Sequence, residues 1–246
     1  MKGLKKIFKR KISIYQMISD DNVSGLIESL NNEADPNELD EYGQTPLFRV
    51  VYNKTPNQLE LLKILLNFNA NANHQHPDDG ATPLYHTKSV DVAECLLSYG
   101  ADLNSKTKLG HIHLHNAFNI EMAEFFITKG LDVNATSDLG STPLFSAVYF
   151  GFDLVEYLIK KGAKTELQNK NGWTPLICLA RTEYANAEDN IELKRICQLL
   201  INNGANIRTT DKQKKDAEVH ALEAKNEELA EYLKQLKRKH NNMYSA

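Results

Sequence analysis

Short runs of apolar residues at helical spacing alternate with polar turn sequences along most of the chain. AECLL at 93–97 and VEYLI at 155–159 are two such runs, and phrases like GADLN at 100–104 follow them. The glycine of that phrase suits the left-handed residue that ends a helix, and Asn69, the next-best residue type, replaces it once. The pattern therefore predicts a series of short amphipathic helices, each closed by a tight turn.

A second phrase lies between these helix ends. It reads GQTPL at 43–47, GATPL at 80–84, GHIHL at 110–114, GSTPL at 140–144 and GWTPL at 172–176. The residues before it, such as DEYG at 40–43, are typical of a type I turn with Asp first and Gly last. The proline fits the first helical position, and four threonines can cap the helix through their hydroxyl groups: Thr45, Thr82, Thr142 and Thr174.

The two phrases together resemble the ankyrin repeat, whose period is about 33 residues. The glycines of the second phrase are spaced by 37, 30, 30 and 32 residues. The resemblance implies an all-α, elongated and curved solenoid of helix–turn–helix repeats with hairpin-like turns. Stacking is required because one helix pair cannot bury its own apolar faces.

The repeat boundaries predict one solenoid over residues 12–236. It would contain an N-terminal capping unit, five regular repeats and a C-terminal capping unit: 12–37, then 40–73, 78–104, 108–134, 138–166 and 170–208, then 211–236. A basic lead-in at 1–11 would precede it, and a basic and polar tail at 237–246 would follow. In the last unit Asp216-Ala217 stands where the helix should begin.

Several repeats depart from the pattern. Those at 78–104 and 108–134 are about three residues short before the second helix, which predicts shortened first helices. Extra residues occur at 53–58 and 182–190, and insertions in solenoids map to loops on one face, often a working one. Ile112 replaces the capping threonine in the third regular repeat. We therefore expect this repeat to lose about 1 kcal/mol of stability and to be the least stable of the series.

The resemblance also implies partner binding through the turn tips and the exposed side of the first helices, which would line a concave groove. Large apolar residues occur at these places although the repeat itself does not require them, and aromatic residues and arginine are common interface hot spots. The predicted contact residues are Tyr42, Tyr52, Leu109, Phe118, Leu139, Tyr149, Phe150, Trp173 and, at a polar rim, Arg181. The alternative for any one aromatic residue is packing between neighbouring repeats.

Charge is distributed unevenly along the chain, whose formal net charge is −3. Residues 1–11 carry six Lys/Arg and residues 234–246 carry four, with no acid in either segment, so the body between them is at −13. An acidic body favours a partner with a basic surface and disfavours nucleic acid, because phosphate contacts need basic residues.

We therefore predict a non-catalytic scaffold, monomeric when unbound, that binds another protein. The shortened repeats resemble those of bacterial and viral ankyrin proteins, in which a toxin-neutralising immunity protein or an effector is a plausible role. The other hypothesis is a peripheral membrane adaptor anchored by residues 1–18, because Leu4, Ile7, Phe8 and Ile12 can share one face of a basic helix. Against it, the first helix of the N-terminal unit can begin at residue 12.

Localisation is predicted to be cytoplasmic. No apolar run reaches the length of a membrane helix, and no secretory signal pattern follows the basic N-terminus. The three cysteines are an odd number without a Cys-x-x-Cys pair, and they lie on apolar helical faces, which predicts buried thiols.

No metal, cofactor or catalytic residue is predicted. His111, His113 and His115 alternate, so an extended tip would point them to opposite sides rather than at one zinc ion. The resemblance instead implies that His115 bonds locally between repeats. Nucleophile-elbow, Walker and HExxH motifs are absent from the sequence, which is evidence against an enzyme.

Overall fold

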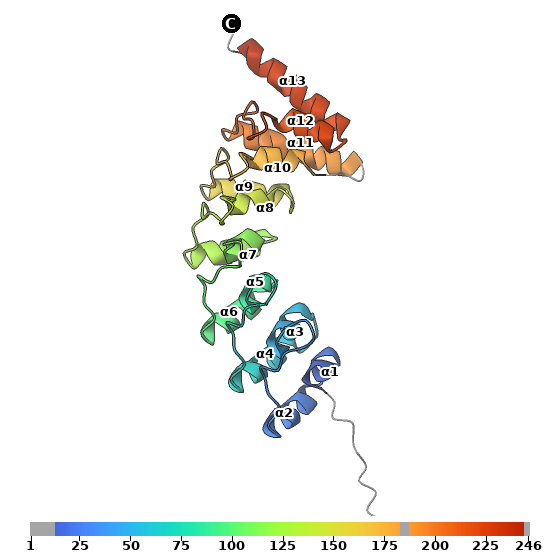
Figure 1. The fold of residues 1–246 in the computed structure, drawn as a ribbon, viewed down its shortest axis with the longest axis vertical. Coiled ribbons are helices and arrows are strands. Elements are labelled where there is room, and N and C mark those ends of the chain that lie inside the picture. Colours follow the sequence, from blue (N-terminus) through green and yellow to red (C-terminus); the bar gives the residue numbers. More distant parts are fainter. Residues whose placement is uncertain (1–12, 183–186, 244–246) are drawn as a thin grey trace, which may run out of the picture. The chain divides into compact units, whose positions relative to one another are not determined.

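The computed structural model describes residues 13–182 and 187–243, and every regular element in these ranges is helical (Figure 1). The chain divides into two compact units, residues 1–103 and 104–246. Their boundary falls between the repeats predicted at 78–104 and 108–134, within the stretch that the sequence presents as one solenoid. The prediction of an all-α repeat fold is confirmed.

The described residues of the first unit form three helix pairs, which Figure 1 labels α1 to α6. They are α1 (Ile14–Ser19) with α2 (Val23–Asn31), α3 (Pro46–Tyr52) with α4 (Gln58–Asn67), and α5 (Pro83–His86) with α6 (Val90–Ser98). The first helices α1, α3 and α5 contact one another in that order, and the second helices α2, α4 and α6 form a second row. The core lies between the two rows.

The second unit contains four pairs built in the same way. They are the 3-10 turn η1 (His113–Asn116) with α7 (Ile120–Thr128), α8 (Pro143–Ala147) with α9 (Phe152–Lys160), α10 (Pro175–Ala180) with α11 (Ala187–Asn202), and α12 (Ala217–Glu223) with α13 (Glu227–Met243). Contacts again run along one row of first helices and one row of second helices.

The leucine after each proline position supplies the repeated core contact. Leu47, Leu84, Leu114, Leu144 and Leu176 are all buried. The second helices end as expected, in residues with positive φ such as Asn69 at 65° and Gly162 at 92°. The three cysteines are buried free thiols, as predicted.

Hydroxyl capping by threonine is mostly wrong as a prediction. Of the four threonines, only Thr174 accepts a capping hydrogen bond, from the Ile177 N–H at 3.3 Å. In the short helices α5 and α8 the third amide bonds the backbone carbonyl of the cap residue instead, as Tyr85 does with Thr82 and Phe145 with Thr142. The hydroxyl is therefore not needed for the first turn.

The two shortened repeats have first helices of four residues each, α5 and η1, as predicted. The replacement of the capping threonine by Ile112 leaves the first turn of η1 intact, because the His115 N–H donates to the Ile112 carbonyl at 2.9 Å. The Nδ1 atom of His115 also accepts a hydrogen bond from the Ile112 N–H at 3.3 Å. The Nε2–H of the same ring donates to the Ser141 carbonyl at 2.9 Å. His115 thus links two repeats, which confirms its predicted role.

The C-terminal pair begins where the sequence indicates, since the Asp216 carboxylate accepts hydrogen bonds from the Glu218 and Val219 amides and caps α12. Its second helix continues beyond residue 236, so the segment predicted to be a polar tail is helical up to Met243. Lys237 belongs to this helix, and its Nζ atom lies 2.6 Å from Asp216 and 2.8 Å from Glu218.

The predicted membrane-binding segment lies largely outside the described residues, because the described chain begins at residue 13. Its last part belongs to α1, in which Ile14 and Ile18 are buried in the core of the first unit. Among the described helices, none combines the length and apolar character that crossing a membrane requires.

Candidate protein-interaction surface

The hairpins of the second unit are joined at their tips by backbone hydrogen bonds. The Asp138 N–H donates to the Leu109 carbonyl at 2.9 Å, and the Lys170 N–H donates to the Leu139 carbonyl at 2.8 Å. The same bond links Lys212 to Asn171 at 3.1 Å. We call this row the tip ridge: Lys108, Leu109, Asp138, Leu139, Lys170, Asn171, Lys212 and Gln213. Its backbone is fixed before any partner binds.

Apolar side chains project from this ridge and from the first hairpin of the first unit. Leu109 is 52% exposed and Leu139 is 47% exposed. In the first unit Tyr42 is 62% exposed, and it lies beside Leu39, which is also exposed. Leu39 is absent from the predicted contact residues because it precedes the recurring turn phrase. The signal available in the sequence was a large apolar residue in an otherwise acidic segment, ELDEY at 38–42.

The first hairpin of the first unit is anchored from both sides. The Tyr15 hydroxyl on α1 donates to the carbonyl oxygens of Glu38 and Gln44. Arg49 on α3 pairs with the Asp40 carboxylate at 3.0 Å. Since these contacts hold the base of the hairpin, the exposed position of Tyr42 is a property of a fixed loop.

The aromatic residues predicted near the ends of the first helices differ in exposure. Tyr52, Tyr149 and Phe150 are exposed, whereas Phe118 is half-buried between η1 and α7. The Tyr149 hydroxyl donates to the Cys178 carbonyl at 3.1 Å, and burial raises its pKa to about 12. The Tyr149 hydroxyl therefore bonds the neighbouring repeat, while more than half of the residue is exposed to solvent.

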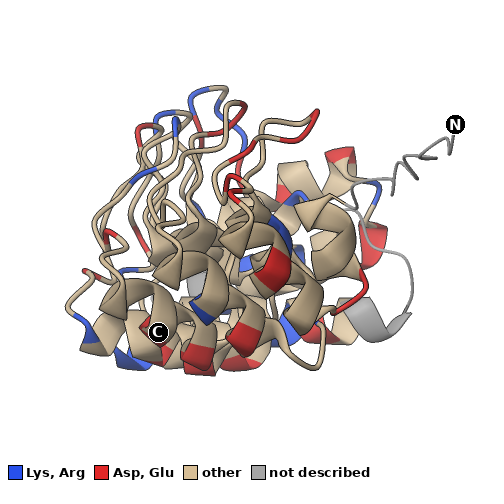
Figure 2. Ribbon diagram, turned by 90° about the horizontal axis from the view of Figure 1, so that it is seen from below, with Lys and Arg blue, Asp and Glu red and all other residues tan. Residues whose placement is uncertain are grey.

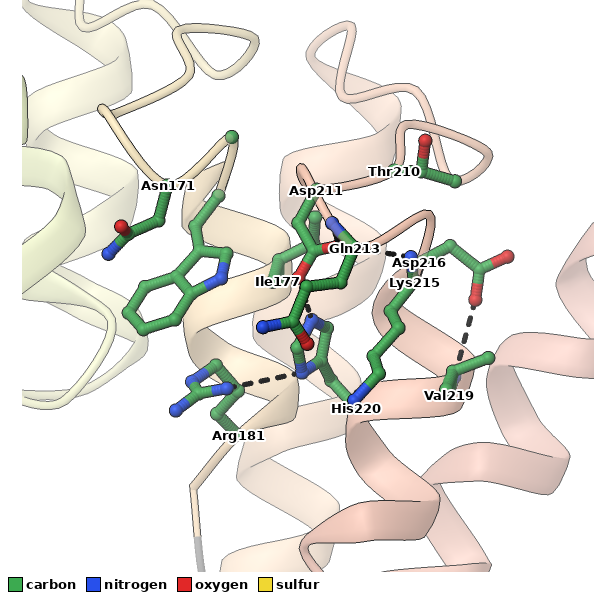
Figure 3. Close-up of polar contacts among 12 residues, drawn as sticks. Asn171, Ile177, Arg181, Thr210, Asp211, Gln213, Lys215, Asp216, Val219 and His220 are labelled. Carbon is green, nitrogen blue, oxygen red and sulfur yellow. Dashed lines mark hydrogen bonds and ion pairs between the residues drawn. The ribbon is translucent and has the colours of Figure 1, made fainter.

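Trp173 and Arg181 are engaged within the protein. The Arg181 guanidinium lies 4.0 Å from the centre of the half-buried Trp173 ring. Its Nη1 atom is 3.2 Å from the Nδ1 atom of His220, whose Nε2 atom is 2.9 Å from the Asp211 carboxylate (Figure 3). Trp173 also meets the His220 ring edge-on, with centroids 6.4 Å apart. The cluster joins the last regular repeat to the C-terminal pair.

The His220–Asp211 pair is buried, and sequence reasoning did not find it. Burial opposes the charged form of Asp211. The Lys215 amide, the His220 ring and the Gln213 amide outweigh it and hold the pKa of this carboxyl below its usual value. These contacts satisfy the pair internally, so it stabilises the hairpin and does not offer a free acid or base.

Negative net charge is concentrated in residues 13–103 of the first unit. Residues 13–103 carry four Lys/Arg and 14 Asp/Glu, whereas residues 104–246 carry 19 and 18. The hairpin tips follow this division, with Glu41, Asp78 and Asp79 in the first unit and Lys108, Lys170 and Lys212 in the second. Figure 2 shows both charge types on the loops. The negative charge inferred for the whole segment between the basic ends is therefore located mainly in residues 13–103.

His113 and His74 serve packing. His113 is buried and stacks on Phe126 with centroids 5.4 Å apart, and His74 lies 3.1 Å from the Gly43 carbonyl. Within the part of the chain that the structure describes, no three His, Cys, Asp or Glu side chains are grouped as a metal ion would require.

Comparison with known proteins agrees with the stacked helix pairs and hairpins. The family model for ankyrin repeats in three copies matches residues 14–107 and 111–189, and a single ankyrin repeat matches residues 171–212. The chain belongs to the ankyrin repeat family. The ankyrin repeat domain of Bcl-3, described as a member of the IkappaB protein family, superposes with a TM-score of 0.63 at 19% identity, covering 85% of this chain and 93% of that one.

Two curated relatives are also ankyrin repeat proteins. A putative one from fowlpox virus is 30% identical over 112 residues, which are 44% of this chain and 18% of the relative. Another from Rickettsia felis is 28% identical over 148 residues, which are 57% of this chain and 51% of the relative. The match thus spans about half of one relative and about a fifth of the other. Ankyrin repeats are protein–protein interaction modules and generally have no catalytic activity.

Proposed function

We propose that this ankyrin repeat protein is a non-catalytic scaffold that binds one partner protein at its hairpin tips and at the exposed ends of its first helices. The observation that carries the proposal is the exposure of large apolar side chains on fixed backbone. Tyr42, Leu109, Leu139, Tyr149 and Phe150 are all exposed, although the repeat pattern does not require large apolar residues at these positions. Clusters of this kind on a soluble protein mark contact surfaces.

The charge of the first unit supports a partner with a basic surface. Around the exposed Tyr42 lie Glu41 and Glu38 in the same hairpin, and Asp78 and Asp79 form the next tip. Opposite charges across an interface raise the association rate and exclude wrong partners more than they add affinity. Nucleic acid is disfavoured at this unit for the same reason.

A preorganised surface without chemistry of its own suits a stoichiometric binder that is monomeric when free. Two biological roles fit such a binder: an immunity protein that neutralises a toxin by covering it, and an effector that occupies a host protein. We favour the first, and we place the protein in the cytoplasm. The structural basis is the same in both roles, because hairpin tips whose backbone is already fixed avoid the entropy cost of ordering on binding.

Membrane attachment through residues 1–18 is the weaker proposal. Burial of Ile14 and Ile18 in the first unit leaves only residues 1–12 to contact lipid. Flotation of the full chain with vesicles that contain about 30% phosphatidylserine tests this attachment. An anionic membrane surface attracts a basic segment by about 1 kcal/mol of binding free energy for each Lys or Arg near it. Equal flotation of the full chain and of a chain lacking residues 1–12 would exclude anchoring by this segment.

Partner binding is tested by affinity capture from the native cell with a tip variant that carries Tyr42→Ser, Leu109→Ser and Leu139→Ser. The matched control is Ile191→Ser on α11, because Ile191 is 61% exposed but lies on a second helix, away from the tips and from the ends of the first helices. We expect the wild type and the control to retain one partner in a stoichiometric complex by light scattering, and the tip variant to lose it with an unchanged melting temperature.

Retention of the same partner by the tip variant would show that the tips do not bind it. A large drop in melting temperature would instead show that the three side chains support the fold, which contradicts their exposure. Either result overturns the assignment of the surface.

A further inference from the structure

A pocket of about 740 Å³ lies in the first unit at the C-terminal ends of α3 and α5. One wall is the link between α3 and α4, residues 53–58, and the other is the link between α5 and α6, residues 87–89. The first wall consists of the extra residues that a regular repeat does not need. The pocket is at the opposite end of α3 from the hairpin that carries Tyr42, so it is separate from the tips.

Two aromatic rings form an apolar surface in this pocket. The Tyr52 and His86 rings have centroids 5.1 Å apart, and Phe48 packs against both from the buried side, at 6.4 Å and 6.1 Å. Burial lowers the pKa of His86, opposed by the Asp79 carboxylate, so the ring is neutral at pH 7. The two rings are tilted by 42° to each other, and such an aromatic surface accommodates an aromatic or aliphatic side chain.

The charged residues that line the pocket are Lys54 and Lys88, with no Asp or Glu among the lining residues. This is unusual for residues 13–103, which carry four Lys/Arg and 14 Asp/Glu. A third cation, Arg49, is paired with Asp40, whereas both pocket lysines are exposed and make no ion pair with any described residue. Two of the four cations of residues 13–103 thus lie at one concave site.

The walls are held in place by hydrogen bonds. The Gln58 amide group donates to the Val50 and Val51 carbonyls at 2.9 Å and 3.2 Å and closes the first link onto α3. The Asn57 side chain donates to Asp21 at 2.9 Å, and Thr87 donates to the Ser89 carbonyl at 3.1 Å. A pocket whose walls are already fixed binds a ligand without paying for their ordering.

We propose that this pocket binds an acidic, extended segment of a partner protein, with an apolar side chain on the Tyr52–His86 surface and carboxylates facing Lys54 and Lys88. The volume lies in the range typical of small-ligand pockets, which suits a few residues of a peptide. The pocket belongs to the first-helix ends that are proposed above to bind a partner, so this inference rests on the proposed function; its ligand has the charge opposite to that of the partner proposed for the hairpin tips of the same unit.

The test uses the full ¹⁵N-labelled chain and a synthetic probe, an acetylated and amidated pentapeptide with phenylalanine at its centre and two glutamates on either side. We expect saturable amide shift changes confined to residues 52–58 and 86–92. The double variant Lys54→Gln/Lys88→Gln should bind about 3- to 10-fold more weakly, as two exposed ion pairs imply. Lys63→Gln is the matched control, an exposed lysine on α4 outside the pocket.

Further arms separate the components of the site. A pentapeptide with lysine in place of glutamate should not bind, and one with alanine in place of phenylalanine should bind more weakly to the wild type. Tyr52→Ala should weaken binding of the glutamate-containing probe, while Tyr42→Ser at the tip should leave that binding unchanged. A pocket that does not bind the probe is therefore distinguishable from tips that do not bind a partner.

Three results would overturn the proposal. The double lysine variant could bind the probe as tightly as the control, or the shift changes could map to other residues. Inorganic phosphate at equal ionic strength could reproduce the shifts at 52–58 and 86–92 when the peptide does not, which would make the pocket a phosphate site. Each result is read directly from the same spectra.

Discussion

Protonation of His115 should destabilise the second unit in mild acid. The ring is 3% exposed, and both of its nitrogens are committed, Nδ1 as an acceptor from Ile112 and Nε2–H as a donor to Ser141. Adding a proton to Nδ1 would destroy the first bond and place a charge in the core. Burial accordingly lowers the pKa of His115 to about 4.

The magnitude follows from the difference between this pKa and the value of about 6.5 in an unfolded chain. The stability that neutral His115 contributes is complete above pH 6.5 and is lost as the pH falls toward 4, because the unfolded chain takes up the proton first. Each pH unit in this window is worth about 1.4 kcal/mol. Lowering the pH from about 6.5 to about 5 should therefore remove about 2 kcal/mol.

The assay compares urea unfolding of the wild type and His115→Gln at pH 7 and pH 5, followed by the fluorescence of Trp173. This is the single tryptophan of the chain, and it lies in the second unit. Glutamine retains an N–H for the Ser141 carbonyl but does not titrate. Because the variant lacks the acceptor for Ile112, its free energy of unfolding should be about 1–2 kcal/mol lower at pH 7. Between pH 7 and pH 5, the variant should lose about 2 kcal/mol less stability than the wild type loses.

Other groups titrate in the same range, among them His111, whose pKa burial also lowers. They remain in both proteins, so the difference between the two pH dependences isolates His115. Equal pH dependence in the wild type and the variant would refute the reasoning, because it would mean that His115 is not held neutral. His115→Asn, which can retain the acceptor instead of the donor, provides a second non-titrating comparison.

Three further changes test packing and capping. Gly172→Ala should lower the free energy of unfolding by about 2–3 kcal/mol and Gly162→Ala by about 1 kcal/mol, as measured by urea unfolding. Both glycines have positive φ, but of the two only Gly172 would place a Cβ against backbone, 2.9 Å from the Lys212 nitrogen. Equal losses for the two variants would contradict the predicted clash. Asp216→Ala should lower stability by about 1–2 kcal/mol through loss of the α12 cap, whereas Asp216→Asn should retain most of it, and circular dichroism measures both. Trp173→Ala should lower the free energy of unfolding by about 2 kcal/mol, because it removes the stacking with Arg181 and the contact with His220. Circular dichroism follows the unfolding, and an unchanged unfolding midpoint would show that the cluster does not stabilise the C-terminal pair.

The candidate surface could be predicted only in part from the sequence. Tyr42, Leu109 and Leu139 lie at turn positions that the repeat leaves outside the core, so their exposure followed from the repeat pattern alone. Trp173 and Arg181 could not be placed in this way, because their contacts come from His220, 39 residues after Arg181. Lys54 and Lys88 belong to different repeats, and only folding brings them to the same pocket.

The sequence by itself determined the repeat fold, the order of its elements and the short first helices α5 and η1. These features depend on local turn chemistry and on a periodic apolar face, which each repeat encodes within about 33 residues. Only the tertiary structure decided the division into two units, the continuation of α13 past residue 236 and the packing of Trp173 and Arg181 against His220. Those features depend on which side chains of neighbouring repeats meet, and the physical reason they escape sequence reasoning is that such contacts form between residues about 25 to 40 positions apart.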